Sequence, residues 1–198
     1  AVNHPYARLK AQPVIDHAPD VWLLGSSDYS GALAAHLGLR FAFAQFISAQ
    51  GGDAVMRTYR KDYRPSKREP LPYAILCSFV VCAETSDEAE RLMKSVDLRR
   101  IHMAKGIEAP VPTVEQSEAY PWTEPERAYA KQQRARTVCG DPQTVKAKLL
   151  EMAQRYQSDE VMILCITGDY ASRRKSYELV ARAFDLAPAA PEIGRAHV

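Results

Sequence analysis

An excess of charge of either sign is missing from this sequence of 198 residues, which carries 26 Lys and Arg against 24 Asp and Glu, a formal net charge of +2. Positive and negative side chains are so nearly equal in number that the chain has no general attraction to nucleic acid or to an anionic membrane. Hydrophobic runs of the roughly 20 residues that a membrane-spanning helix needs are also missing, and no signal peptide is recognisable. We therefore expect a cytoplasmic protein without a nucleic-acid or membrane partner.

Cysteine is scarce, with four residues and no C-x-x-C spacing. Cys77, Cys82 and Cys165 lie within apolar runs, which is typical of buried free thiols in a reducing compartment. No histidine falls at a metal-ligand spacing from any of them, so the sequence predicts no metal site.

Four apolar runs of strand length alternate with helical patterns. The predicted strands are Val21–Leu24, Phe41–Phe46, Tyr73–Cys82 and Glu160–Ile166. Strands that alternate with helices predict right-handed crossovers and an α/β fold with a parallel sheet. The near-continuous apolar character of the third run favours a strand that is covered on both faces.

The helical pattern is lost between residues 101 and 136, where four prolines punctuate the chain. A short helix is predicted there from Glu124 to Gln133. An insertion of this length in a compact domain is usually functional or mobile. After it, Asp141 and Pro142 have the residue types of a helix N-cap and first helical position.

Two architectures fit this order of elements. Four strand–helix units are half of a (β/α)₈ barrel, which typically needs ~250 residues. A flavodoxin-like open sheet would be complete at about this length and also binds its ligand beside a strand–helix turn. The order of elements leaves both architectures open.

The turn after the first strand is rich in serine. Gly25 ends the strand, and Ser26, Ser27, Asp28 and Ser30 follow where a helix should begin. Free backbone N–H groups and the helix dipole make such a turn suitable for an anion. Ser26 or Asp28 would equally serve as an ordinary helix cap. The spacing alone does not distinguish the two interpretations.

Taken together, several motifs resemble the bacterial luciferase-like family of flavin-dependent monooxygenases. Each motif is modest alone, but their order and spacing across most of the chain are specific. The motifs are L-L-G-S-S-D-Y-S at 23–30, G-L-R-F-A-F-A at 38–44, V-V-C-A-E-T at 80–85, V-C-G-D-P-Q-T-V at 138–145, D-E-V-M-I-L at 159–164 and R-x-x-S-Y-E-L-V-A from 173.

The resemblance implies that residues 1–191 are a partial TIM-barrel domain, the C-terminal half of a TIM (β/α)₈ barrel that is truncated at the N-terminal side. These residues would supply the last four β/α units, with a mobile active-site insertion at about 101–136. The final seven residues, 192–198, read E-I-G-R-A-H-V, which is the in-frame translation of a common sequencing adapter. We expect them to be adapter read-through and exclude them from the fold.

The resemblance also implies a function, the oxidation of a small organic substrate by reduced FMN and O₂. A flavin reductase would supply the reduced FMN, and the full-length protein would be a homodimer. The catalytic residues would belong to the missing half, so none is nominated here, and the fragment alone should be inactive. A deazaflavin-dependent oxidoreductase and a non-catalytic flavin-binding protein remain alternatives.

The same resemblance assigns five residues to the cofactor. Ser27 and Ser30 fall where the family binds the FMN phosphate, within the turn that Gly25 and Ser26 begin. Gln45, at the end of the second strand, falls where family members place a large side chain beside the flavin ring. We expect Gly25, Ser26, Ser27, Ser30 and Gln45 to contact FMN.

Overall fold

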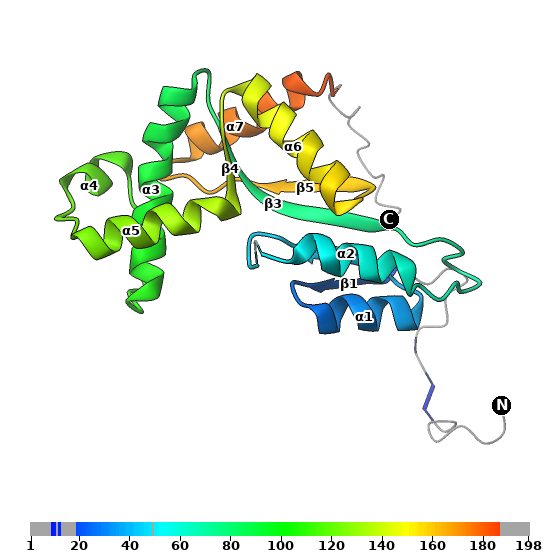
Figure 1. Cartoon of the computed structure of the whole chain (residues 1–198). Coiled ribbons are helices and arrows are strands. Elements are labelled where there is room, and N and C mark those ends of the chain that lie inside the picture. The colour runs from blue at the N-terminus through cyan, green and yellow to red at the C-terminus, as the bar shows by residue number, and fades with distance from the viewer. Residues whose placement is uncertain (1–8, 11, 13–18, 49, 187–198) are drawn as a thin grey trace.

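Strands and helices alternate along the chain in the computed structural model, which describes residues 9–10, 12, 19–48 and 50–186 (Figure 1). The expected read-through segment 192–198 lies outside these residues. No helix in the described part is long and apolar enough to span a membrane. The elements are β1 (Trp22–Gly25), α1 (Asp28–Leu37), β2 (Arg40–Ala44), α2 (Gly52–Lys61), β3 (Ala74–Cys82), α3 (Ser86–Ala104), α4 (Val114–Ala119), α5 (Glu124–Gln133), the 3₁₀ helix η1 (Arg134–Arg136), β4 (Thr137–Gly140), α6 (Pro142–Tyr156), β5 (Glu160–Leu164) and α7 (Tyr170–Ala183).

The sheet is parallel throughout, and β1, β2, β3 and β5 are neighbours in that order. β2 and β5 both pair with Ile75–Cys77 of β3, so they lie along its opposite edges. The predicted parallel arrangement is confirmed. A flavodoxin-like sheet interleaves its strands instead of following chain order, so that alternative is wrong.

A fifth strand, β4, was not predicted. It pairs with Phe79–Cys82, farther along β3 than the segment that binds β2. Its four residues include a glycine and are too short to show a strand period. The extra length of β3 supplies the backbone partners that make this segment a strand.

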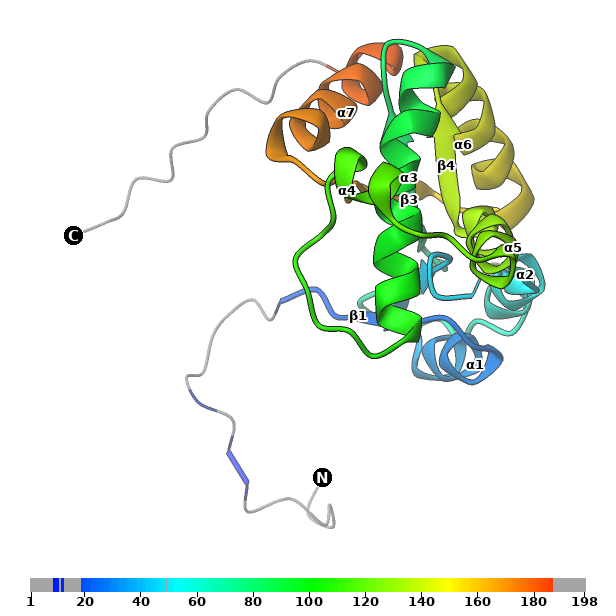
Figure 2. The same cartoon turned by 90° about the vertical axis from the view of Figure 1, so that its left-hand side faces the viewer.

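The insertion contains more helix than its sequence pattern predicts. α3 continues to Ala104, and α4 forms within the stretch where the pattern is lost, whereas α5 has the predicted bounds. Thr113 and Gln116 form a capping box that begins α4. Figure 2 shows α4 and α5 on either side of α3. The predicted mobility of this segment stays a prediction.

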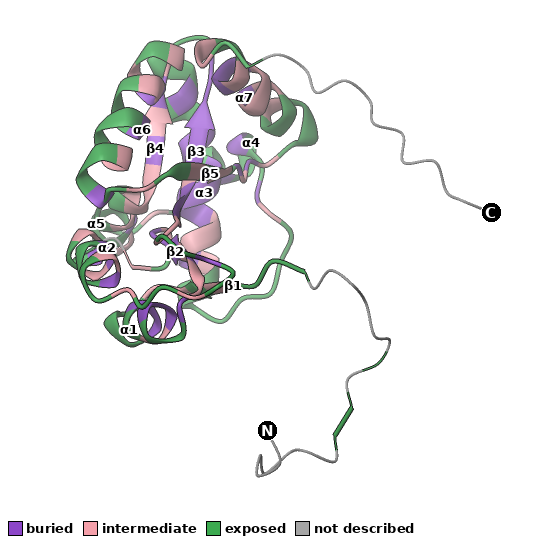
Figure 3. Cartoon of the chain, turned by 90° about the vertical axis from the view of Figure 1, so that its right-hand side faces the viewer, coloured by how far each residue is buried: buried purple, intermediate pink, exposed green. Residues whose placement is uncertain are grey.

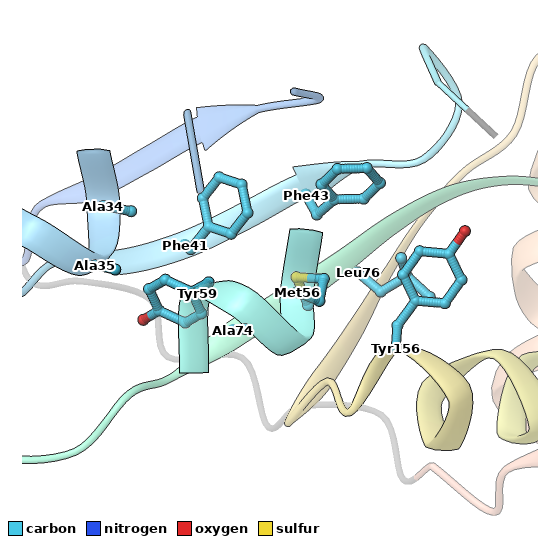
Figure 4. Close-up of a cluster of buried hydrophobic side chains, with 9 residues drawn as sticks. All are labelled: Ala34, Ala35, Phe41, Phe43, Met56, Tyr59, Ala74, Leu76 and Tyr156. Atoms are coloured by element: carbon cyan, nitrogen blue, oxygen red, sulfur yellow. The ribbon is translucent and has the colours of Figure 1, made fainter. Parts of the chain in front are cut away.

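α1, α2, α6 and α7 cover one face of the sheet, whereas α3 packs on the other face at the end of β3. Phe41 and Phe43 of β2 and Leu76 of β3 point into a cluster that Tyr59 of α2 and Tyr156 of α6 complete (Figure 4). All five side chains are at most 1% exposed. The Tyr59 hydroxyl donates to the Leu39 carbonyl at 2.9 Å and accepts from the Tyr73 N–H at 3.2 Å, which fixes the starts of β2 and β3.

The opposite face of β1 and β5 has little cover (Figure 3). Successive side chains of a strand point to opposite faces, and Leu23 and Ile163 pack toward the helices. Their neighbours Leu24, Met162 and Leu164 are accordingly on the other face, where they are 65%, 51% and 36% exposed. An apolar sheet face of this kind is what the interior of a barrel presents.

Gly38 provides a test of how α1 is joined to the rest of the fold. It ends α1 with φ at 61°, and a β-carbon there would lie 2.4 Å from the Arg64 carbonyl oxygen. We expect Gly38→Ala to lower the free energy of unfolding by about 2–4 kcal/mol, from left-handed backbone strain and steric overlap together.

Gly106→Ala is the matched control for this change. Gly106 has φ at 68° but no atom within 4 Å of the added carbon. Only the backbone strain of about 1–2 kcal/mol should then remain. Equal losses for the two variants in urea unfolding would contradict the role of the Arg64 contact.

Candidate cofactor-binding site

The serine-rich turn forms a capping box at the start of α1. Ser27 is the N-cap, and its hydroxyl accepts from the Ser30 N–H at 3.3 Å. The Ser30 hydroxyl accepts from the Ser27 N–H at 3.2 Å and donates to the Ser27 carbonyl at 2.7 Å. The cap is therefore Ser27, not Ser26 or Asp28, because the spacing of three residues allows Ser27 and Ser30 to satisfy each other's backbone.

Gly25 has a packing role in this turn. A β-carbon at Gly25 would lie 2.2 Å from the Ser30 hydroxyl oxygen. Only glycine allows the Ser30 side chain to lie against the end of β1, where it is 9% exposed. Gly25 thus positions Ser30, and Ser30 in turn positions Ser27.

The two serine hydroxyls differ in what they can still bind. The Ser30 hydroxyl is buried and donates its hydrogen bond to the Ser27 carbonyl. Ser27 is exposed, and its oxygen accepts from the Ser30 N–H. This oxygen also lies 3.3 Å from the Ser30 hydroxyl oxygen, so the Ser27 proton can point either to Ser30 or outward to a ligand. Ser26, half-buried beside it, makes no hydrogen bond through its hydroxyl within the described residues.

Asp28 is the feature of the turn least suited to an anion. Its carboxylate is exposed and accepts from the Tyr29 N–H at 2.8 Å. This carboxylate thereby occupies one of the free N–H groups at the positive end of α1. A bound phosphate would have to compete with this side chain for that position.

Gln45 lies at the same edge of the sheet as the serine turn. Gly25 pairs with Phe43 in register, so Gln45 comes just beyond the end of β2. Its side chain is 3% exposed and fully engaged, because it accepts from the Ser78 hydroxyl at 3.0 Å and donates to the Ala135 carbonyl at 3.3 Å. Gln45 therefore ties β2 to β3 and to the insertion.

Aromatic side chains that sequence reasoning missed stand next to Gln45. The rings of Phe46 and Phe79 are 4.8 Å apart between centroids, and both residues are half-buried. Phe79 lies on β3 and Phe46 follows β2, so the contact depends on strand pairing. No local sequence signal would identify this pair.

A second polar cluster joins α3 to the end of the insertion. Arg134 donates to the Asp97 carboxylate from Nε at 2.9 Å and from Nη2 at 2.6 Å, and it also pairs with Glu90. Burial raises the pKa of the Asp97 carboxyl group, an effect that the Arg134 charge opposes. A cavity of about 560 Å³ between α3, α4 and α5 adjoins this pair, and its lining includes none of the predicted cofactor residues.

The cysteines match their sequence prediction. Cys77, Cys82 and Cys165 are buried and free, and Cys139 is half-buried and free. Burial raises the pKa of Cys82 to about 11, so its thiol stays protonated and unreactive at neutral pH. Within the described ranges, no group of His, Cys, Asp or Glu side chains is arranged to hold a metal ion.

Comparison with known proteins gives a consistent result. The family model for luciferase-like monooxygenases matches residues 3–158. The uncharacterized protein YceB of Bacillus subtilis is 39% identical over 92% of this chain and 55% of its own length. The chain thus spans about half the length of the curated relatives it matches.

Solved structures agree on the fold. The crystal structure of apo-MsnO8 is 33% identical and has a TM-score of 0.83, over 91% of this chain and 55% of that one. The oxygenating constituent of 3,6-diketocamphane monooxygenase from Pseudomonas putida, solved with FMN, is 16% identical with a TM-score of 0.54. It covers 84% of this chain and 48% of its own, and at this identity it shows the fold alone.

The capping role of Ser27 can be measured directly. We expect Ser27→Ala to lower the free energy of unfolding by about 1 kcal/mol, because the Ser30 N–H loses its acceptor. Ser27→Asp should remain within about 0.5 kcal/mol of the parent, since aspartate is an equally good N-cap. Urea unfolding of both variants tests the assignment. A loss for Ser27→Asp as large as that for Ser27→Ala would contradict it.

The Gln45 contact is suited to a double-mutant cycle. Gln45→Leu leaves the Ser78 hydroxyl and the Ala135 carbonyl without their buried partner and should cost about 1–3 kcal/mol. Combining it with Ser78→Ala should cost less than the sum of the single changes, with a coupling of about 0.5–3 kcal/mol. Additive losses in urea unfolding would mean that the two side chains do not interact.

Proposed function

Because the chain belongs to the luciferase-like monooxygenase family, we propose that it forms the FMN-phosphate-binding part of a flavin-dependent monooxygenase. The observation that carries the proposal is the capped N-terminus of α1, where the exposed Ser27 hydroxyl can turn its proton outward while its oxygen accepts from the Ser30 N–H. This group lies at the carboxyl edge of a parallel sheet, where α/β proteins of this kind bind their ligands.

We propose that the chain supplies four consecutive strands of a (β/α)₈ barrel. The chain-order sheet and the exposed side chains Leu24, Met162 and Leu164 support this arrangement. So does the coverage of only 55% of apo-MsnO8. In the complete barrel, a second half of similar size would cover this apolar face and contribute the remaining catalytic groups.

The described residues fit a phosphate with one adjustment. Ser27 would donate its hydroxyl proton, and the backbone N–H groups that begin α1 would add donors. Ser30 and Gly25 act behind Ser27 by fixing its position, so their roles are indirect. The Asp28 carboxylate must leave the Tyr29 N–H when phosphate binds, because two anions would otherwise share one site.

The rest of the edge suits the flat part of a flavin. Phe46 and Phe79 offer half-buried rings that exclude water, and Gln45 holds them by joining β2 to β3. Gln45 would then act through these neighbours, since both ends of its amide are already bonded within the protein. Reduced FMN, when bound, supplies the reaction with O₂ that oxidises the substrate.

The FMN complex of the 3,6-diketocamphane enzyme supports the choice of cofactor. A small organic molecule would be the substrate, and a flavin reductase would provide the reduced FMN. The homodimer of the longer protein belongs to the same proposal. A relative in Bacillus subtilis, 28% identical, is named N-acetyl-S-alkylcysteine monooxygenase, which supports oxygenation of a small organic molecule as the reaction class.

Phosphate recognition is tested by titrating FMN and riboflavin into the 198-residue chain and its Ser27→Asp variant. The variant keeps the helix cap but places a negative charge on the phosphate site. We expect it to weaken FMN binding about 10–100-fold, the equivalent of one charge-assisted hydrogen bond. Riboflavin, which lacks the phosphate, should bind both proteins equally.

Asp28→Asn is the opposite control. The variant lacks the carboxylate that competes with phosphate, so FMN should bind the variant more tightly than the parent. Equal weakening of FMN and riboflavin by Ser27→Asp would show that Ser27 only shapes the turn. A deazaflavin titrated in parallel distinguishes the cofactors, and preferential binding of the deazaflavin would contradict FMN as the cofactor.

A further inference from the structure

The cavity between α3, α4 and α5 is a second concave site, separate from the cofactor edge. Its volume of about 560 Å³ is within the range of small-molecule sites. Its lining residues lie between Lys94 and Arg134, so the walls come from one continuous stretch of the chain. Figure 1 shows this stretch at one end of the sheet, with α4 on the far side of α3 from the strands. The cavity therefore forms without the outer strands β1 and β5, whose exposed side chains the second half of the barrel would cover.

A buried carboxylate lines this cavity. The Asp97 side chain is 7% exposed, and its Oδ2 atom accepts two hydrogen bonds from Arg134. Its Oδ1 atom is buried as well and has no hydrogen-bond partner among the described residues. A buried carboxylate oxygen without a donor is costly. An N–H donor that enters the cavity would remove this cost, and a cationic donor would also offset the burial that raises the pKa of Asp97.

Two cations of α5 line the same cavity without acidic partners. Arg127 and Lys131 are about one helical turn apart, and both are exposed. In the part of the chain that the structure describes, neither forms an ion pair. The Glu118 carboxylate, which also lines the cavity, is already paired with Lys94 at 2.8 Å. The cavity thus combines free positive charge on its exposed side with a buried negative charge.

Tyr120 and Trp122 give the cavity an aromatic wall. Their rings are in edge-to-face contact, with 5.3 Å between centroids and an interplanar angle of 77°. The Trp122 indole N–H donates to the Ser117 carbonyl at 2.8 Å, which fixes the orientation of the ring. The Arg127 guanidinium lies 5.9 Å from the centre of the Trp122 ring, so a positive charge stands beside the aromatic wall. A ligand that carries a flat apolar group near a carboxylate matches this arrangement.

We propose that this cavity binds an α-amino acid with an aromatic side chain. The ammonium group of the ligand donates to Oδ1 of Asp97. Its carboxylate pairs with Arg127 and Lys131. Its side chain packs against Tyr120 and Trp122. A simple anion would leave the Asp97 oxygen without a donor, and a simple cation would be repelled by the two free cations of α5. A zwitterion satisfies both groups, and its binding here does not depend on flavin binding.

Calorimetric titration of the 198-residue chain with L-phenylalanine tests the ligand class. Phenethylamine lacks the carboxylate and 3-phenylpropionate lacks the ammonium group, but both keep the ring and its spacing. We expect each analogue to bind about 10–100-fold more weakly than phenylalanine, the equivalent of one charge-assisted hydrogen bond. Binding of 3-phenylpropionate as tight as that of phenylalanine would reduce the cavity to an anion site and overturn the proposal. No binding of phenylalanine up to its solubility limit would also overturn it.

Charge-removing variants test the assigned contacts. Lys131→Gln should weaken phenylalanine about tenfold and leave phenethylamine unchanged, because only phenylalanine has the carboxylate that Lys131 binds. Lys61→Gln is the matched control and should bind like the parent, since Lys61 is an exposed lysine near the end of α2, outside the cavity. Asp97→Asn should weaken phenylalanine and phenethylamine alike. Circular dichroism checks its folding, and if it is unfolded, Lys131→Gln decides. A parent-like affinity of Lys131→Gln for phenylalanine would contradict the proposal.

A titration of FMN in the presence of saturating phenylalanine separates this cavity from the cofactor edge. We expect both ligands to bind at once, because the cavity lining shares no residue with the predicted cofactor site. Strict competition between them would place the amino acid at the flavin site and overturn the proposal. The variants are compared with phenylalanine and phenethylamine alone, so a failure of FMN to bind would contradict only the proposed flavin function.

Discussion

Among the described elements, β3 alone pairs with three other strands, and the rest of the structure depends on this pairing. Its first half binds β2 on one edge and β5 on the other, and its second half binds β4. Eight of its nine residues are buried. The same strand lies between two clusters of buried side chains, because Val80 packs with α6 and α7 while Val81 packs with α3 and α4. Loss of its register would therefore misplace the helices on both faces.

The serine turn meets two demands with the same atoms. Folding requires Ser27 to cap α1, and phosphate binding requires a donor at the same point. These demands are compatible because a hydroxyl can accept from Ser30 while it donates outward. A carboxylate cap would satisfy folding as well but would repel the ligand. The neighbouring Asp28 carboxylate shows why, because it accepts from the Tyr29 N–H and would compete with phosphate for the same helix N-terminus.

Local chemistry made much of the fold predictable. The apolar runs of β1, β2, β3 and β5 and the Asp141 cap of α6 could be predicted because each depends on neighbouring residues. β4 and α4 could not be predicted from neighbouring residues. β4 is a strand only because β3 extends past β2 to meet it, and α4 is a single capped segment of six residues in a proline-rich stretch.

By itself, the sequence determined the parallel α/β class and the serine-rich helix start, because turns, caps and apolar periods act over a few residues. The tertiary structure decided that neighbouring strands follow chain order, which excluded the flavodoxin-like sheet. The tertiary structure decided which hydroxyl remains available, because Ser30 is held against Gly25 at the end of β1. It also decided the role of Gln45, whose amide meets a carbonyl 90 residues away at Ala135. Contacts between residues so distant in the chain form only when the strands are paired, so no local pattern encodes them.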